Sequence, residues 1–225
     1  MRRFFMIFLC FCLLSKVPVS AAQREFVALT FDDGPSGRFT RRLLDGLEER
    51  NVKATFLLCG YRLESYQSLA QRIFDSGHEI GLHGYTHRDM SSLSRKELIR
   101  EIGDTKKLLP KGCEPVFLRP PGGRENSLVQ AVAKQAGLSV LQWSVDPRDW
   151  AVHDAGAVEA AVVDQVRNGD VILLHDLSDS SVDAAFAIID RLQKEGFTFV
   201  TVSQLAALRG IKPEPGKVYK SFPPD

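Results

Sequence analysis

Seven short apolar runs recur along the chain, separated by longer stretches in which apolar and polar residues follow a helical period. Most of these runs are continuously apolar rather than alternating, which is typical of strands that are buried on both faces. Turn residues or helical patterns bound each run. We therefore predict strands over residues 26–31, 53–58, 79–82, 116–118, 139–143, 171–174 and 197–200.

The intervening stretches carry apolar residues at helical spacing, as Leu43, Leu44 and Leu47 illustrate. One stretch has an explicit start signal, because Ser94 is followed three residues later by Glu97, the pattern of a capping box. Several of the stretches end at a glycine, which favours helix termination. The predicted helices cover residues 41–50, 65–75, 95–109, 127–136, 157–167, 182–194 and 202–208.

Strands that are each followed by a helix predict a parallel sheet covered by helices on its outer face. Because no long linker interrupts the series, we expect a single α/β domain, a distorted (β/α)7-type barrel with parallel strands. An open doubly wound sheet is the alternative, but the sequence has no Gly-rich phosphate loop to support it. In a barrel, functional residues gather at the carboxyl ends of the strands, so chemistry is expected there.

The first residues differ from the rest of the chain. A basic start and the apolar run 4–14 precede small residues, and residues 1–22 are therefore predicted to be a signal peptide cleaved near Ala21 or Ala22. Lys16 follows too soon for the run to reach the roughly 20 residues of a membrane span. We expect an exported protein, periplasmic or extracellular, with no stable membrane span after cleavage.

The predicted domain covers residues 23–210. Residues 211–225 contain several prolines and are expected to form an extended tail, either wrapped on the domain or free in solvent. The remaining cysteines, Cys59 and Cys113, both lie beside predicted strands. They could pair in an oxidising compartment or stay as buried free thiols, and the sequence leaves both possibilities open.

Length and charge narrow the class of protein. The chain has 225 residues and 44% hydrophobic content, enough for one domain with a sizeable core. Its Lys and Arg residues number 29 against 28 Asp and Glu, so the net charge of +1 gives no reason to expect nucleic acid or an anionic surface as partner. We expect a monomer.

Two adjacent carboxylates, Asp32 and Asp33, end the first predicted strand. Such a pair is costly unless a positive group accompanies it, although a solvated Asp-Asp-Gly-Pro turn is the simpler interpretation. The third predicted strand leads to His83 and His87. Two imidazoles and one aspartate form the donor set of a catalytic zinc-type site that leaves positions open for water and substrate. His78, on the other side of the same strand, is expected to pack or cap.

Further motifs with polar residues lie at the ends of the next three predicted strands. They are Arg-Pro-Pro-Gly-Gly at 119–123, Asp-Pro-Arg-Asp-Trp at 146–150 and Leu-Leu-His at 173–175. Each one alone is compatible with an ordinary loop. Because all of them fall where a barrel gathers its functional residues, they indicate a single site.

In this order, the five motifs resemble those of the polysaccharide deacetylases, carbohydrate esterase family 4, also called the NodB homology domain. The resemblance spans about residues 25–208. It implies that Asp33, His83 and His87 hold one divalent metal ion and that Asp32 is the general base. Zinc suits these ligands best, with cobalt, nickel or manganese as alternatives.

The resemblance also implies roles for supporting residues. Arg119 would hold Asp32 by a charge-assisted hydrogen bond. Asp149 would orient His175, which would protonate the leaving group.

Three further residues would bind the acetyl group. The backbone N–H of Gly122 would help to hold the oxyanion, while Trp150 and Leu173 would form an apolar pocket for the acetyl methyl. The family usually carries tyrosine where this chain has Gly122, so the backbone donor is kept but an aromatic wall of the sugar groove is lost. This departure bears on substrate choice and on rate.

The expected function is an exported, metal-dependent hydrolase that removes N-acetyl groups, releasing acetate, from N-acetylglucosamine-type glycans. Chitin oligomers, peptidoglycan and poly-N-acetylglucosamine are the candidate substrates. One alternative is an O-acetyl esterase acting on xylan-like glycans. Another is a catalytically silent glycan-binding protein, which the loss of a motif acid, base or ligand would favour; none is missing from the sequence.

Overall fold

The computed structural model describes residues 24–224. The predicted signal peptide, residues 1–22, lies outside the described residues. Within residues 24–224, no helix combines the length and the apolar character needed to cross a membrane.

All seven predicted strands are present, with small shifts at their ends. The second begins two residues later than predicted and the fifth ends two residues earlier. An additional strand, β8, forms near the C-terminus. The strands are β1 (Glu25–Asp32), β2 (Thr55–Leu58), β3 (Glu79–Leu82), β4 (Phe117–Leu118), β5 (Ser139–Leu141), β6 (Val171–His175), β7 (Phe197–Val200) and β8 (Val218–Tyr219).

The helices also follow the prediction, except that the stretch before β3 holds two helices, the first beginning at Gly60. The capping box at Ser94 is formed, because its hydroxyl accepts from the Glu97 N–H and the Glu97 carboxylate accepts from the Ser94 N–H. The helices are α1 (Gly37–Glu49), α2 (Gly60–Ser65), α3 (Gln67–Asp75), α4 (Arg95–Lys107), α5 (Ser127–Gln135), α6 (Ala155–Val163), α7 (Asp179–Lys194) and α8 (Val202–Leu208).

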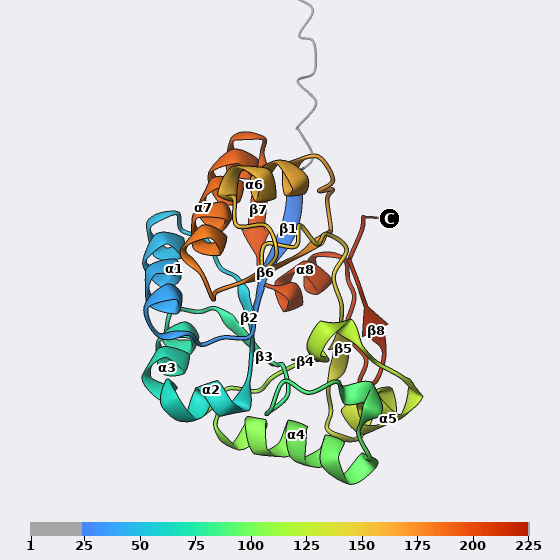
Figure 1. The fold of residues 1–225 in the computed structure, drawn as a ribbon. Helices are drawn as coiled ribbons and strands as arrows, with labels where there is room; N and C mark the ends of the chain where they lie inside the picture. The colour runs from blue at the N-terminus through green and yellow to red at the C-terminus, as the bar shows by residue number, and fades with distance from the viewer. Residues whose placement is uncertain (1–23, 225) are drawn as a thin grey trace, which may run out of the picture.

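The strands form one parallel sheet in the order β6-β1-β2-β3-β4-β5-β8, with β7 also paired to β1 (Figure 1). A parallel bridge between Val145 and Ile172 links the segment after β5 back to β6. The sheet therefore curls round on itself, and the predicted distorted barrel is confirmed. The doubly wound open sheet is wrong because its edge strands would not be linked in this way.

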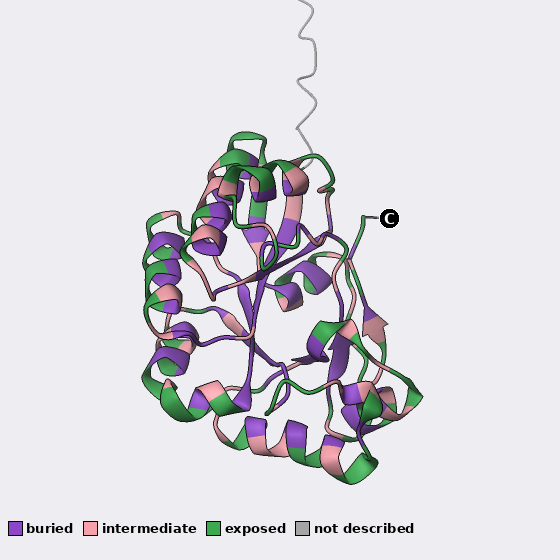
Figure 2. Cartoon of the chain, viewed as in Figure 1, coloured by how far each residue is buried: buried purple, intermediate pink, exposed green. Residues whose placement is uncertain are grey.

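Alternation along β1 decides which residues face the barrel interior. Val27, Leu29 and Phe31 belong to the apolar cluster shared with α1 and α7, on the helix side of the sheet. Successive side chains of a strand point to opposite faces, so Thr30 and Asp32 point into the barrel. Figure 2 shows the result as buried strands inside a shell of helices whose outer faces are exposed.

The C-terminal segment packs on the domain. Its strand β8 pairs with β5 in parallel, and the rings of Tyr219 and Phe222 stack with their centroids 5.4 Å apart. Phe222 is fully buried, in the apolar cluster that also contains residues of α8. The proline-containing tail thus covers one edge of the sheet, which limits pairing with other chains.

Two other expectations concern single residues. Cys59 and Cys113 are both free thiols, so the disulfide alternative is not formed. Burial raises the pKa of the Cys59 thiol well above its ordinary value, which makes it unreactive. His78 packs as expected: its Nδ1 accepts from the Ala54 N–H at 3.2 Å and its ring lies edge-on to Phe56.

Candidate active site

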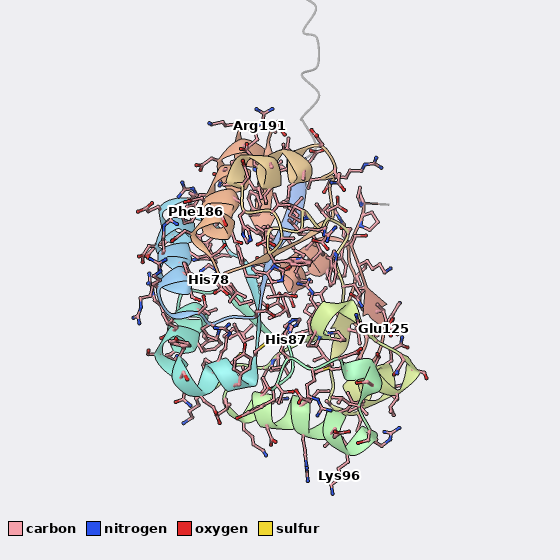
Figure 3. The ribbon with its side chains drawn as sticks, in the orientation of Figure 1. His78, His87, Lys96, Glu125, Phe186 and Arg191 are labelled. Carbon is pink, nitrogen blue, oxygen red and sulfur yellow. The ribbon has the colours of Figure 1, made fainter. Side chains whose placement is uncertain are left out.

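A cavity of about 390 Å³ opens at the carboxyl ends of the strands. Its lining contains every predicted site residue except Arg119 and Asp149, which lie directly behind Asp32 and His175. Figure 3 shows His87 near the centre of the molecule, where the strand ends converge. The lining residues are Asp32, Asp33, His83, His87, Gly122, Trp143, Asp146, Trp150, Leu173 and His175.

Asp33, His83 and His87 converge at one point of this cavity. Asp33 Oδ1 lies 3.2 Å from His83 Nε2 and 3.0 Å from His87 Nε2, and the ligand atoms of the three residues all lie within 4.8 Å of one another. Asp33 and His87 have positive φ angles of 72° and 60°, so sharp backbone turns aim both side chains at the same place. The site is therefore assembled by three segments, the ends of β1 and β3 and the loop after β3.

The tautomer of His83 shows what this group can bind. Its Nδ1 lies 2.7 Å from the carbonyl oxygen of Arg119, which can only accept, so Nδ1 carries the proton and Nε2 directs a lone pair at Asp33. Asp33 Oδ1 is buried and has no hydrogen-bond partner within residues 24–224. Lone pairs from two imidazoles and a carboxylate at such a separation fit a divalent cation.

The electrostatics of Asp33 agree with this assignment. Burial opposes ionisation of its carboxyl, but in the metal-free protein the hydrogen bonds and positive charge that the imidazoles of His83 and His87 supply when protonated outweigh burial and hold the pKa well below its ordinary value; a divalent cation would supply that positive charge when the imidazoles are neutral. Asp33 is thus a carboxylate at neutral pH, as a metal ligand must be.

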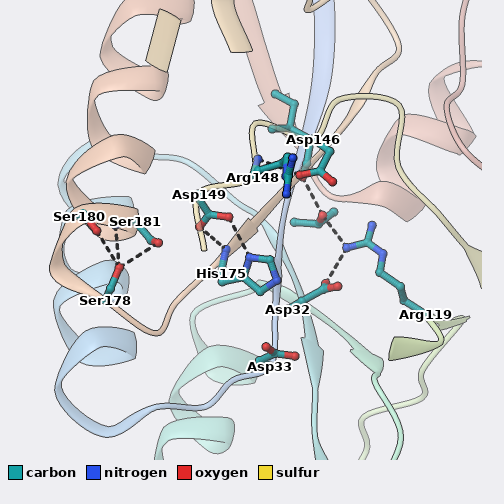
Figure 4. Close-up of polar contacts among 12 residues, drawn as sticks. Asp32, Asp33, Arg119, Asp146, Arg148, Asp149, His175, Ser178, Ser180 and Ser181 are labelled. Carbon is teal, nitrogen blue, oxygen red and sulfur yellow. Dashed lines mark hydrogen bonds and ion pairs between the residues drawn. The ribbon is translucent and has the colours of Figure 1, made fainter. Parts of the chain in front are cut away.

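Asp32 is held from behind by Arg119, as Figure 4 shows. The guanidinium of Arg119 donates to Asp32 Oδ1 at 2.6 Å, to the Thr30 hydroxyl at 2.8 Å and to the carbonyl of Gln142 at 3.0 Å. Arg119 is fully buried and Asp32 is 3% exposed. The other carboxylate oxygen, Asp32 Oδ2, lies 3.7 Å from His83 Nε2. Arg119 therefore occupies one oxygen of Asp32 and leaves the second for the cavity.

His175 and Asp149 form a second buried pair (Figure 4). The two oxygens of Asp149 contact His175 at Nδ1, 2.8 Å away, and at the backbone N–H, 2.9 Å away. Burial lowers the pKa of His175, but the hydrogen bond and the negative charges of Asp149, Asp32 and Asp33 outweigh burial and raise it to about 9. The pair fixes the ring so that Nε2 is the nitrogen available to a substrate.

The rim of the cavity is built differently. Gly122 has φ 61°, and a Cβ added there would have only the side chain of Arg124 within reach, at 4.0 Å. Trp150 is 56% exposed, and the guanidinium of Arg148 lies 5.4 Å from the centroid of its indole. Leu173 is buried and forms part of the cavity wall. Gly122, Trp150 and Leu173 therefore offer apolar surface and open space, with Asp146 and Arg148 as the charged groups beside them.

Some residues of the site were not predicted from the sequence. Trp143 and Asp146 line the cavity, and Thr30 accepts a hydrogen bond from Arg119. Two of them carried a signal, since Asp146 begins the 146–150 motif and Thr30 precedes Asp32 by two residues on the same strand face. Trp143 carried none, because it looked like the last residue of a strand.

Asp176, next to His175, is another residue that the sequence did not single out. It is fully buried and accepts a hydrogen bond from the Thr40 hydroxyl, while the Ser36 hydroxyl donates to its backbone carbonyl. A Cβ on Gly34 would lie 2.7 Å from Asp176 Oδ1, so this close approach requires glycine. Burial raises the pKa of Asp176 to about 7. Asp176 thus ties the turn after Asp33 to the end of β6.

Comparison with known proteins agrees with this fold and site. The polysaccharide deacetylase family profile matches residues 20–141. A peptidoglycan-N-acetylglucosamine deacetylase of Bacillus cereus is 39% identical over 187 residues, which cover 80% of this chain and 88% of that protein. The peptidoglycan-N-acetylmuramic acid deacetylase PdaC of Bacillus subtilis is 36% identical over 188 residues, which cover 83% of this chain but only 40% of PdaC.

A solved structure is also similar. A family 4 acetyl xylan esterase from Clostridium thermocellum, determined in complex with a cobalt ion, superimposes with a TM-score of 0.82 at 35% identity. The match covers 88% of this chain and 100% of the esterase chain. The barrel and its strand-end site thus define a hydrolase. The chain belongs to the polysaccharide deacetylase family, as its five motifs indicated.

Proposed function

We propose that this chain is an exported, metal-dependent N-deacetylase that releases acetate from N-acetylglucosamine-type glycans. The observation that carries the proposal is the convergence of Asp33, His83 and His87, whose ligand atoms lie within 4.8 Å of one another. Asp32 and His175 line the same cavity, so a base and an acid accompany the ligand set. A glycan-binding protein without catalysis would have no need of all five groups.

The ligand set fits a single divalent ion. Two imidazole nitrogens and one carboxylate oxygen suit zinc, and cobalt, nickel or manganese tolerate the same ligands. When bound, such an ion supplies Lewis acidity, which polarises an acyl oxygen and acidifies water. The cobalt ion in the related esterase structure supports a divalent ion at this kind of site.

Proton transfer falls to Asp32 and His175. Hydrolysis of an N-acetyl amide adds water to the acetyl carbon and breaks the C–N bond, so one proton must leave the water and one must reach the nitrogen. Asp32 takes the first proton through the oxygen that Arg119 leaves free. His175 delivers the second from Nε2, while Asp149 holds its Nδ1. An amine leaves poorly as an anion, so this acid is indispensable for an amide.

The rest of the cavity binds the acetyl group. The backbone N–H of Gly122 is the proposed donor to the oxyanion. Leu173 and Trp150, which line the same cavity, form the apolar surface for the methyl group. Because Gly122 carries no side chain, the sugar groove is open on that side, which favours bulky or substituted glycans.

Peptidoglycan strands, chitin oligomers and poly-N-acetylglucosamine are the proposed substrates. Two of the relatives are named as peptidoglycan deacetylases, one for N-acetylglucosamine and one for N-acetylmuramic acid. An exported enzyme would meet these polymers, in agreement with the predicted signal peptide at residues 1–22. We propose that the enzyme acts as a monomer, since one chain supplies all the groups of the site.

A second candidate is an O-acetyl esterase acting on xylan-like glycans. The similarity to an acetyl xylan esterase at a TM-score of 0.82 favours it. The same residues serve both reactions, and an ester needs less help from the acid because an alkoxide leaves more readily than an amine anion. Dependence on His175 therefore separates the two: His175→Ala abolishes amide hydrolysis but leaves substantial ester hydrolysis.

Acetate release from a substrate panel tests the proposal. The panel contains acetylated chitooligomers, peptidoglycan and acetylxylan, each assayed with zinc, with a chelator, and with metal restored. The expected result is release from the amino-sugar glycans that the chelator stops and zinc restores. Activity that persists after complete metal removal would contradict the metal assignment. Glycan binding without turnover under any added divalent ion would instead favour the silent binder.

A further inference from the structure

The short loop between His83 and His87, residues 84–86, is held from two sides. The N–H groups of Gly60 and Tyr61, at the start of α2, donate to the carbonyls of Gly84 at 2.9 Å and Tyr85 at 3.0 Å. These bonds satisfy the carbonyls of the loop on its α2 side. The N–H groups of Tyr85, which is partly buried, and of Thr86, which is exposed, face the other side and find acceptors there.

Glu101, on α4, supplies those acceptors. Its Oε2 accepts from the N–H of Tyr85 at 2.6 Å and from the N–H of Thr86 at 2.8 Å. Its Oε1 accepts from the Thr86 hydroxyl at 2.6 Å. Helices α2 and α4 contact each other (Figure 1), so the loop is clamped between the amides of one helix and the carboxylate of the other.

The carboxylate of Glu101 is committed to this loop. It is 6% exposed, and within residues 24–224 no Lys, Arg or His nitrogen lies within 4.0 Å of it. A buried carboxylate without a cation is costly unless hydrogen-bond donors surround it. The three donors on Glu101 all come from residues 85 and 86. The free-energy cost of burying the Glu101 carboxylate therefore depends on the conformation of the loop.

The loop conformation in turn sets the position of His87. The backbone has a positive φ of 79° at Gly84, which glycine adopts freely, and of 60° at His87, where a residue with a Cβ holds it only with support from its surroundings. The side chain of His87 is 42% exposed, with its ring centroid 5.2 Å from that of His83, and its Nε2 lies 3.0 Å from Asp33 Oδ1. Its placement therefore depends on the hydrogen bonds made by the two residues before it.

We propose that Glu101 is a positioning residue that acts through the 84–86 loop to hold His87 against Asp33 and so sets the affinity of the site for its divalent ion. Glu101 is not among the residues that line the cavity of the proposed site. The proposal rests on the metal site of the proposed function, and it predicts a loss of metal affinity that a general loss of stability does not explain.

The first test compares two substitutions on α4. Glu101→Ala removes the acceptors of the loop. Ile102→Ala, at a buried core position of the same helix, lowers stability without touching the loop. Zinc affinity of the metal-free full-length protein is measured by competition with a chromophoric chelator. We expect the zinc Kd to rise about 10- to 100-fold in Glu101→Ala and to stay within about threefold of wild type in Ile102→Ala.

Conservative variants show whether geometry is the cause. Glu101→Gln keeps the shape: its carbonyl can accept from both N–H groups and its amide can donate to the Thr86 hydroxyl, so zinc affinity is expected within about threefold of wild type. Glu101→Asp is one methylene shorter and is expected to give an intermediate loss. This pair keeps the test decisive if Glu101→Ala does not fold.

Two readouts report on the loop itself. The amide protons of Tyr85 and Thr86 should exchange with solvent faster in metal-free Glu101→Ala than in metal-free wild type. The visible spectrum of the Co²⁺-loaded protein should change in Glu101→Ala and not in Ile102→Ala, because the ligand geometry changes only in the first.

The outcomes separate this proposal from the previous one. If the wild type binds zinc tightly and Glu101→Ala binds it equally well, the positioning role is wrong while the metal site stands. If Glu101→Gln loses as much affinity as Glu101→Ala, the hydrogen-bond geometry is not the cause and the proposal is overturned. If the wild type binds no zinc, cobalt, nickel or manganese, both proposals are wrong.

Discussion

The floor and the rim of the cavity are built in opposite ways. On the floor, Asp32, Arg119, His83 and Asp149 are all at most 3% exposed, and each makes a hydrogen bond or ion pair with a defined partner. On the rim, His87 and Trp150 are exposed, and Gly122 has no side chain at all. The floor is rigid because its charges are paired in a dry environment, whereas the rim is open to solvent.

This difference separates chemistry from substrate choice. In a low dielectric a paired charge is held strongly and an unpaired one is very costly, so the floor tolerates few substitutions. Exposed positions contribute little to stability, so the rim can change without unfolding the domain. We therefore assign reaction type to the floor together with the ligand His87, and glycan preference to the rest of the rim, Gly122 and Trp150. The following experiments test that division, from the largest expected effect to the smallest.

His83→Ala and His87→Ala compare a floor ligand with a rim ligand. Both should lower kcat/KM by about 10³-fold or more, because each removes one of three protein ligands. His83→Ala should also reduce the free energy of unfolding by about 2 kcal/mol, since the Arg119 carbonyl loses its donor in a buried position. His87→Ala should change it by no more than about 0.5 kcal/mol. Metal content reports the loss of a ligand, steady-state kinetics give kcat/KM, and denaturant unfolding gives the free energy of unfolding. Equal destabilisation by both would contradict the division.

Arg119→Met tests the buried ion pair of the floor. Removing the guanidinium leaves Asp32 buried without its cation, so the free energy of unfolding should fall by about 3–5 kcal/mol at neutral pH. Arg42→Met is the matched control: Arg42 forms exposed ion pairs with Asp179 and Asp183, and its loss should cost no more than about 1 kcal/mol. Denaturant unfolding of both variants measures these two losses in the free energy of unfolding. A small effect of Arg119→Met would mean that Asp32 is not held by this pair.

Asp149→Asn tests the pH dependence that the floor imposes. The pKa of His175 is raised to about 9 from an ordinary value of about 6.5, so its acid form is favoured by the fold and is lost as the pH rises through the raised pKa. The rate of deacetylation should therefore decline as the pH rises towards about 9. A bound cation would repel the imidazolium and lower its pKa, so the decline should begin at or below that pH. Without the carboxylate, burial lowers the pKa of His175, and the alkaline limb should move to lower pH by about one unit or more. The pH profile of kcat/KM at saturating zinc measures the shift; an unmoved limb would show that another group sets it.

Trp150→Ala tests the rim. The side chain is 56% exposed, so its removal should leave the free energy of unfolding within about 0.5 kcal/mol of wild type. KM for glycan substrates should rise a few fold, with a smaller change in kcat, because in the proposed binding mode the indole would contact the substrate in the ground state and in the transition state alike. Leu208→Ala, at another exposed apolar position, is the control that should change neither constant. A collapse of kcat would place Trp150 in the chemistry instead.

Much of this molecule could be predicted from local pattern. Continuous apolar runs located the seven strands, and the capping pair at Ser94 and Glu97 located the start of α4. The family motifs indicated ten site residues, which the structure places in or directly behind one cavity. Local pattern succeeded here because a buried parallel strand and a helix cap depend on residues close in sequence.

Other features could not be predicted in this way. The two-residue strand β8 is too short to have a period of its own, and it exists because the edge of β5 pairs with it. Glu101 looked like one more polar residue of an amphipathic helix, yet it is buried against the loop of residues 84–86. Asp176 directly follows His175, and no local pattern marks it as buried, yet it is fully buried and contacts Ser36 and Thr40. In each case the partner is distant in sequence.

By itself, then, the sequence determined the order of strands and helices, the donor atoms offered to a metal ion, and the family. Only the tertiary structure decided that Asp176 is enclosed by Ser36 and Thr40, that the tail closes one edge of the sheet, and that Glu101 accepts from the N–H groups of the loop before His87. The physical reason is that periodicity and capping are encoded by neighbouring residues. The partner of a buried charge is chosen by the packing of the whole barrel, where burial makes an unpaired group too costly to keep.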